Sequence, residues 1–213
     1  MHSVNIGCGQ TPTEGWKNFD NSLSLKLAGS TVRFAVAKAL GFLSADQLNY
    51  IDWLRDNRIE FADAVRRIPL PDASSKVVYT SHMLEHISRD GARAFLLEAK
   101  RVLAPGGVLR IVVPDLGKAI ERYNDDGDAE AFMEHMLVAA PPLTSVRDKV
   151  HLLFTGYRHH QWMYDGRSLS ALLEELGFRD VVVQPAGETM IEDPGTLDLF
   201  ERSEESVYVE ARR

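Results

Sequence analysis

Short hydrophobic runs alternate along the chain with longer stretches of helical periodicity. The runs predict strands near residues 4–6, 16–20, 59–62, 76–81, 108–113, 181–183 and 206–210. Apolar positions three and four apart predict helices near 31–40, 88–103, 128–140 and 169–176, and another that begins at Ser44, with Gln47 completing a capping box. The pattern is therefore strand and helix in alternation.

This alternation predicts one α/β domain over residues 1–213. Its expected fold is doubly wound and Rossmann-like, with a mostly parallel sheet covered by helices on both faces. Two stretches, 21–58 and 117–160, interrupt the regular alternation and are predicted to be insertions that cover the active site. Because ligands of such sheets bind outside the carboxyl ends of the strands, those ends are where chemistry is expected.

The first strand runs into Gly7-Cys8-Gly9, a turn in which backbone N–H groups can approach a polar ligand closely. Pro12 stands where the dinucleotide fingerprint G-x-G-x-x-G requires its third glycine. Only residues 7–15 separate the first two strands, which leaves room for at most one helical turn. These departures disfavour a pyrophosphate cofactor such as NAD.

Acidic residues end the second and third predicted strands. Asp20 can accept hydrogen bonds from the two hydroxyls of a ribose, at about 1.5–3 kcal/mol each. Asp63 can accept one from an exocyclic amine such as that of adenine. The pair predicts a nucleoside clamp, whereas the alternative is two ordinary strand-end acids in turns.

Four segments, taken in order, resemble class I S-adenosylmethionine-dependent methyltransferases of the type 11 kind. They are residues 4–9 with Asp20, residues 63–72, Leu84-Glu85-His86-Ile87, and the stretch 101–109, which reads RVLAPGGVL. The resemblance extends over about residues 4–178. It implies a seven-stranded sheet whose last strand is antiparallel, S-adenosylmethionine as cofactor and S-adenosylhomocysteine as product.

The resemblance also implies roles for individual residues. Gly7, Cys8 and Gly9 are expected to line the methionine part of the cofactor, and Asp20 to hold its ribose. The remaining expected contacts are those of adenine with Asp63 and Ala64, and those of the methionine end with Ser81 and His82.

Methyl transfer from a sulfonium needs alignment above all, and it needs a general base only for an acceptor that is protonated at neutral pH. The sequence offers candidates without choosing among them: His82, Asp115, Tyr157, His159, His160 and Tyr164. His159 and His160, in an aromatic-rich stretch, are the preferred contacts with substrate. Cys8 is interpreted as a small packing residue rather than a nucleophile.

A different class of function comes from His82-Met83-Leu84-Glu85-His86, which fits the H-x-x-E-H zinc pattern of a hydrolase. That pattern requires both histidines on one helix, whereas His82 directly follows a strand. We therefore expect no metal. A further alternative is a module that binds the nucleoside or S-adenosylmethionine without catalysis.

Composition narrows the partners. A net charge of −7 and a pI near 5.5 argue against nucleic acid, and favour a small-molecule or glycan-type acceptor. The single cysteine allows no internal disulfide, and neither a signal peptide nor a run of 18 apolar residues is apparent. We expect a cytoplasmic protein, and nothing in the sequence indicates an oligomeric state.

Overall fold

The computed structural model describes residues 1–39, 41, 43, 45–138 and 159–213. Its centre is a seven-stranded sheet in the order β3-β2-β1-β4-β5-β7-β6, in which β7 runs antiparallel to both of its neighbours. The strands are β1 (His2–Ile6), β2 (Lys17–Asp20), β3 (Ile59–Phe61), β4 (Ser75–Ser81), β5 (Leu103–Pro114), β6 (Arg179–Gln184) and β7 (Ser206–Arg212). The predicted mostly parallel sheet with an antiparallel last strand is confirmed.

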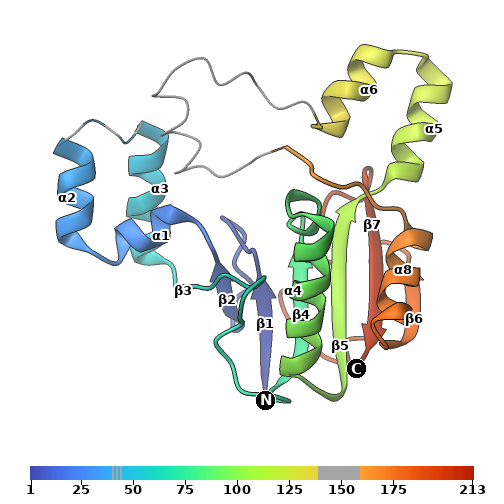
Figure 1. Cartoon of the computed structure of the whole chain (residues 1–213), viewed down its shortest axis with the longest axis horizontal. Helices are drawn as coiled ribbons and strands as arrows, with labels where there is room; N and C mark the ends of the chain where they lie inside the picture. The colour runs from blue at the N-terminus through green and yellow to red at the C-terminus, as the bar shows by residue number, and fades with distance from the viewer. Residues whose placement is uncertain (40, 42, 44, 139–158) are drawn as a thin grey trace.

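Helices lie on one face of the sheet and beyond the carboxyl ends of the strands (Figure 1). They are α1 (Leu23–Ala28), α2 (Thr31–Ala39), α3 (Ala45–Asp56), the 3-10 helix η1 (Leu84–His86), α4 (Arg89–Val102), α5 (Leu116–Asp126), α6 (Ala129–Met136) and α8 (Gly166–Glu175). Helices α1 and α5 are additions to the sequence prediction. The expected cap at Ser44 and the end of the helix expected to reach residue 140 lie outside the described residues.

The main core lies between the sheet and helices α4 and α8. Helix α4 contributes Ala92, Phe95 and Leu96 to it, and α8 contributes Leu169 and Leu173, all of them 0% exposed. These positions recur three and four residues apart, so each helix turns one apolar stripe toward the sheet, α4 toward β5 and α8 toward β6 and β7. The core fixes β1 and β4 side by side, and their carboxyl ends are where the ligand site was predicted.

The second face of the sheet is covered differently. A helix-free segment, residues 185–205, packs Ile191 and Leu197 against strand residues that include Tyr79 and Tyr208. Arg110 on β5 and Glu210 on β7, which both contact this segment, form an ion pair of 2.7 Å. Both side chains are 0% exposed. The prediction of helices on both faces therefore holds for the α4 and α8 face, while an irregular segment anchored to a buried ion pair covers the other.

The connection from β1 to β2 contains no helix, as its length predicts. Side-chain amides hold it instead: Asn5 Nδ2 donates to the Thr13 hydroxyl at 3.0 Å, and Asn18 Oδ1 accepts from the Thr13 backbone N–H at 2.8 Å. Asn18 Nδ2 donates back to the Thr13 carbonyl at 3.0 Å. The turn after β1 is therefore shaped by three polar side chains rather than by a helix that follows it.

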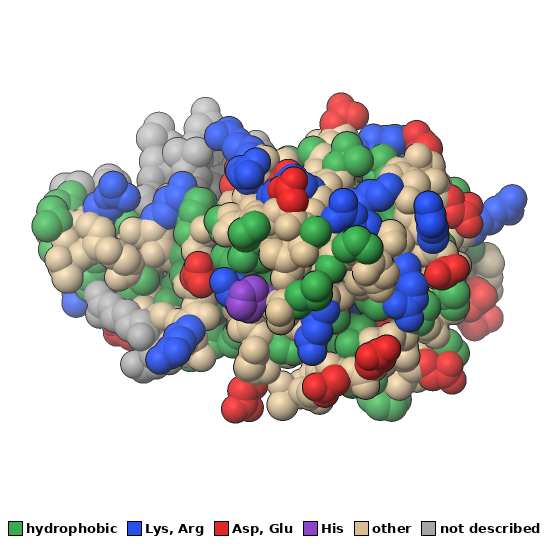
Figure 2. All heavy atoms as spheres, turned by 90° about the horizontal axis from the view of Figure 1, so that it is seen from below, with side chains coloured by type: hydrophobic (Ala, Val, Ile, Leu, Met, Phe, Trp, Pro, Cys, Tyr) green, Lys and Arg blue, Asp and Glu red, His purple; other side chains and the backbone are tan. Residues whose placement is uncertain are grey.

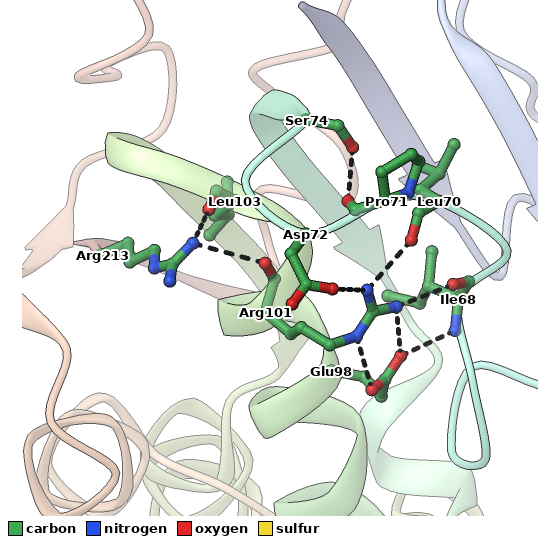
Figure 3. A network of polar contacts seen from close by, with 9 residues as sticks. All are labelled: Ile68, Leu70, Pro71, Asp72, Ser74, Glu98, Arg101, Leu103 and Arg213. Carbon is green, nitrogen blue, oxygen red and sulfur yellow. Dashed lines mark hydrogen bonds and ion pairs between the residues drawn. The ribbon is translucent and has the colours of Figure 1, made fainter.

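Arg101, near the end of α4, connects this helix to the loop at residues 68–72 (Figure 3). Its guanidinium donates two hydrogen bonds to the Glu98 carboxylate, at 2.9 and 2.8 Å, and others to the carbonyls of Ile68 and Leu70 and to the Asp72 carboxylate. Glu98 in turn accepts from the Ile68 backbone N–H at 3.0 Å. Two prolines keep this loop out of regular structure, so the arginine supplies the hydrogen bonds that a helix or ladder would otherwise provide.

The surface at the amino ends of the parallel strands, opposite the predicted ligand site, carries side chains of several kinds. Figure 2, which views the molecule from below, shows acidic, basic and hydrophobic side chains interspersed on this face.

None of the helices in the described part of the chain combines the length and apolar character that crossing a bilayer requires.

Candidate active site

A cleft of about 870 Å³ opens at the carboxyl ends of β1, β2 and β4. We call the lining residues from the N-terminal part of the chain the first wall, namely Ile6, Gly7, Gly9, Asp20, Asn21, Ala62, Ala64 and Val65. The lining residues from the rest of the chain are called the second wall, namely His82, Met83, Glu85, His86, Ile87, Pro114, Glu134, His135, Leu137, His160, Gln161, Arg202 and Glu205. The cleft lies where doubly wound sheets bind ligands. Most of the polar side chains are on the second wall.

The glycine turn forms the floor of the first wall. The N–H groups of Gly7 and Cys8 both donate to the Phe19 carbonyl, at 2.8 and 3.2 Å, which ties the turn to β2. Gly7 has φ +71°, and a Cβ built on it would lie 2.6 Å from Met83 Cγ. The backbone conformation and the close approach of Met83 both require glycine at this position.

Cys8 is buried between the two glycines and does not line the cleft. Burial, helped by the negative charge of Asp20, raises the pKa of its thiol to about 12. The thiol is therefore protonated near neutral pH, as expected for a packing residue and not for a nucleophile.

Asp20, at the end of β2, lines the cleft and is partly bonded already. Its Oδ2 accepts from the Gly9 N–H at 3.1 Å and its Oδ1 from the Ser22 N–H at 2.7 Å. Because a carboxylate has about four acceptor positions, two remain for a ligand. The two backbone bonds fix the orientation of the carboxylate at the cleft wall.

The turn after β3 brings only some of the predicted residues to the cleft. Ala64 lines it, whereas Asp63 does not, and the Asp63 carboxylate lies 3.3 Å from Arg66 Nε. Ser81, the last residue of β4, is also outside the lining, and its buried hydroxyl has no hydrogen-bond partner among the described residues.

His82 follows β4 in the left-handed region, with φ +47°. Its Nε2 lies 3.0 Å from the Ser206 hydroxyl and its Nδ1 lies 3.5 Å from Glu85 Oε1. The side chain lines the cleft but is held against β7. His82 is thus directed away from the helical pairing with His86 that the zinc-hydrolase pattern needs.

Glu85, His86 and His160 come together at the second wall. His86 Nε2 is 3.7 Å from Glu85 Oε1, and the rings of His86 and His160 have centroids 5.0 Å apart. Burial lowers the pKa of His160, with the charge of Glu85 acting in the opposite direction. His160 is therefore neutral at pH 7.

Backbone contacts hold His160 beside η1 although it is distant in sequence. The Gln161 N–H donates to the Glu85 carbonyl at 2.7 Å, and Gln161 Nε2 donates to the His86 carbonyl at 2.7 Å. His86 Nδ1 lies 3.3 Å from the carbonyl of His159. The two histidines predicted to contact substrate therefore differ in role. His160 lines the cleft, while His159 supplies a backbone acceptor.

Two further candidates have structural roles, and a third lies outside the described residues. Asp115 caps α5 by accepting from the Gly117 N–H at 2.9 Å, and it is not part of the lining. Tyr164 is 1% exposed, and burial raises its pKa to about 12. Tyr157 falls in the stretch that the structure does not describe.

Several cleft residues had no signal in the sequence. Glu134 and His135 come from α6, and Arg202 and Glu205 from the segment that covers the second face. Arg202 and Glu205 belong to a stretch without motif or clear periodicity, and the helix predicted over residues 128–140 did not indicate that Glu134 and His135 face the cleft. Only the fold could bring these residues to the carboxyl ends of the strands.

Comparison with known proteins agrees with this architecture. Residues 34–111 match a family model described as methyltransferase domain, a range that leaves the glycine turn and Asp20 outside the match. No curated protein matches the chain.

Solved structures share the fold at low sequence identity. A SAM-dependent methyltransferase from Methanosarcina mazei is 14% identical with a TM-score of 0.52, covering 99% of this chain and 91% of its own. A complex between the Haloferax volcanii Trm112 methyltransferase activator and the putative methyltransferase gives 14% identity and a TM-score of 0.50, with 99% of this chain and 81% of that chain covered. Residues 34–111 are thus similar to a methyltransferase domain, and the chain shares the fold of a solved S-adenosylmethionine-dependent methyltransferase.

Proposed function

We propose that the enzyme transfers the methyl group of S-adenosylmethionine, bound along Gly7, Gly9 and Asp20, to a small-molecule or glycan-type acceptor at the opposite wall. The observation that carries this proposal is the composition of the cleft. The first wall includes two glycines, two alanines and one oriented carboxylate, and the second includes four histidines and three glutamates. One cavity therefore offers different contacts for a cofactor and for an acceptor.

On the cofactor side, the two acceptor positions left on Asp20 suit the ribose hydroxyls. Gly7 and Gly9 offer a floor free of side chains for the methionine part, with Cys8 packed beneath it. Ala64 and His82 line the cleft, which supports them as the proposed contacts of the adenine ring and of the methionine end. Ser81 remains a proposed contact of the methionine end, although it lies outside the lining. Asp63 remains a proposed adenine contact, although its carboxylate faces Arg66, so we expect its replacement to matter less than that of Asp20.

On the acceptor side, the cavity size is informative. A volume of about 870 Å³ lies near the upper end of the roughly 300–1,000 Å³ that small-molecule sites occupy. It suits a cofactor and one compact acceptor. Asn21, from the stretch 21–58, and Glu134, from the stretch 117–160, line the cleft, which supports the proposal that both insertions cover the site within one domain.

The chemistry asked of these residues is mainly alignment. The acceptor atom, the methyl carbon and the sulfur must lie in line, and such positioning supplies about 7–11 kcal/mol of a barrier. A protonated acceptor would also need a base. Of the candidates, His82 and His160 line the cleft, whereas Asp115 caps a helix.

Thermal unfolding with S-adenosylhomocysteine, S-adenosylmethionine or NAD tests the cofactor site. A ligand at a hundred times its dissociation constant stabilises the folded state by about 2.7 kcal/mol. We expect this shift with both sulfur compounds and not with NAD. Absence of a shift with either sulfur compound would overturn the proposal.

The Asp20→Asn variant localises the site. The loss of one or two charge-assisted bonds at about 1.5–3 kcal/mol each predicts at least a tenfold weaker affinity for S-adenosylhomocysteine. The matched variant Asp63→Asn should weaken binding by less. Equal affinities of wild type and Asp20→Asn would show that the ribose lies elsewhere.

A further inference from the structure

The Glu85 carboxylate is the most unusual group in the cleft. The side chain is 1% exposed, and neither carboxylate oxygen makes a hydrogen bond within the described part of the chain. No lysine or arginine among the described residues forms an ion pair with it, and its nearest charged or titratable neighbours are His82 and His86. A buried carboxylate without such partners is costly unless a cation occupies the space beside it.

His86 is arranged as metal-binding histidines are. Its Nδ1 lies 3.3 Å from the His159 carbonyl, so the proton is placed on Nδ1. The lone pair of Nε2 then faces Glu85. A backbone carbonyl that fixes the ring in this way is the usual second-shell partner of a ligating imidazole.

His160 completes the group. Its Nδ1 is buried and has no hydrogen-bond partner among the described residues. Its ring is tilted by 60° to that of His86, so the two rings are not stacked. One ligand atom from each of Glu85, His86 and His160 lies within 4.8 Å of the others.

We propose that Glu85, His86 and His160 bind a divalent transition-metal ion of the zinc type, with an open coordination position toward the cleft. Two imidazoles and one carboxylate are a three-ligand set that catalytic zinc sites use. Tetrahedral metal–ligand bonds of about 2.0–2.2 Å put ligand atoms roughly 3.3–3.6 Å apart, so side chains whose ligand atoms now lie within 4.8 Å of one another must move closer to bind the ion. Imidazole ligands favour such an ion over Mg²⁺.

This set differs from the H-x-x-E-H pattern, because His160 takes the place of His82, which is bonded to Ser206. It also departs from the metal-free site expected from the sequence. His160 is 74 positions beyond His86 in the chain, so no local spacing could have indicated it.

The open coordination position gives the metal site a role in methyl transfer. This role rests on the proposed function. A hydroxyl acceptor bound there loses its proton to solvent more readily, because the ion stabilises the alkoxide. The oxygen lone pair then forms the bond to the methyl carbon, and the electrons of the breaking S–CH₃ bond stay on sulfur. The sulfonium becomes a neutral thioether, and the acceptor class is a hydroxyl compound able to coordinate the ion.

Metal titration of the full chain, stripped with a chelator, tests the site. We expect one equivalent of Zn²⁺ to bind and raise the unfolding midpoint, Co²⁺ to give the visible absorption of a protein-bound ion, and Mg²⁺ to have little effect. His160→Gln and Glu85→Gln should each weaken Zn²⁺ binding at least tenfold. His135→Gln, a cleft histidine outside the group, should keep wild-type Zn²⁺ affinity.

Stability of the metal-free variants gives a second readout. Glu85→Gln removes a buried charge, so its metal-free form should unfold at or above the wild-type midpoint while it loses Zn²⁺ binding. Equal Zn²⁺ affinity in wild type and both variants, or no binding to wild type, would overturn the metal site. S-adenosylhomocysteine binding, measured without metal on the same samples, reports separately on the proposed function.

Discussion

Gly7 and Gly9 show two different reasons why a position requires glycine. Both have positive φ, but a Cβ on Gly7 would meet Met83, whereas one on Gly9 would meet nothing within 4 Å. Gly7 is therefore required by the packing of the turn against the loop after β4. Gly9 is required by backbone conformation and leaves open space at the cleft.

The comparison of Gly7→Ala with Gly15→Ala separates these two costs. Gly15 has φ +77° with nothing near its Cβ position, so its replacement carries only the conformational penalty. Gly7→Ala adds overpacking, and we expect it to lower the free energy of unfolding by about 1–3 kcal/mol more. Chemical denaturation of both variants measures the difference, and equal losses would mean that Met83 moves aside freely.

At the residue scale, the sequence predicted what local pattern determines. The glycine turn and Asp20 follow directly from strands with readable ends, and the structure places Gly7, Gly9 and Asp20 at the cleft. His160 was predicted as a substrate contact from its aromatic-rich stretch and lines the cleft, whereas Arg202 and Glu205 come from a stretch whose neighbouring residues gave no such indication. Asp63 shows that a recognisable strand end is not sufficient, because the carboxylate of this strand-end acid lies beside Arg66 and outside the cleft lining.

At the scale of elements, the contact between α4 and the loop at 68–72 depends on one residue. Arg101 is 19% exposed at its side chain and bonds two carboxylates and two carbonyls. We expect Arg101→Ala to lower the free energy of unfolding by about 2–4 kcal/mol, because three part-buried acceptors, on Glu98, Ile68 and Leu70, lose their donor. The control variant Arg93→Ala, on the same helix as Arg101, breaks an exposed pair with Glu175 of α8 and should leave the unfolding midpoint nearly unchanged.

The same contact predicts a pH dependence. The hydrogen bond from Arg101 lowers the pKa of Glu98 below its ordinary value. A carboxyl group with a lowered pKa contributes stability above its unfolded pKa of about 4.3, and that contribution is lost as pH falls through the folded value. The stability difference between wild type and Arg101→Ala should therefore be largest above about pH 5 and shrink below about pH 4. A difference independent of pH would contradict this assignment.

Helices were predictable from sequence to the extent that one face is apolar. Helix α4 shows five buried positions at helical spacing, and its predicted range of 88–103 compares with Arg89–Val102 in the structure. Helix α5 carries Leu116, Ala119, Ile120 and Tyr123 three and four residues apart, so its periodicity was present in the sequence although the prediction omitted it, and Ala119 alone of the four is buried. Helix α1 is only 6 residues long and falls below what periodicity can detect.

For the whole molecule, the two faces of the sheet are stabilised by different means. One face is packed by helices, and the other by the segment 185–205 around the Arg110–Glu210 pair. Glu210 also accepts from the Thr189 hydroxyl at 2.6 Å and the Met190 N–H at 2.5 Å, so it ties the segment to β7. Strand alternation predicted neither the pair nor the irregular cover, since both depend on partners far apart in sequence.

A double-mutant cycle tests this arrangement. Arg110→Met and Glu210→Leu should each lower the free energy of unfolding by about 3–5 kcal/mol, because each leaves a buried charge without its partner. The combined variant should lose clearly less than the sum of the two. Additive losses, measured by denaturant unfolding, would show that the charges are not coupled.

The helix-free connection between β1 and β2 also has an electrostatic consequence for the cofactor. A helix that began just after the glycine turn would bring about half a positive charge to the floor of the cleft. None begins between Gly7 and Trp16, a stretch that the structure describes in full. Asp20 therefore places a negative charge beside this floor without an opposing helix N-terminus. If the methionine part of S-adenosylmethionine lies there, as proposed, this charge would attract the cationic sulfonium of the donor more than the neutral thioether left after transfer, and would favour release of the spent cofactor.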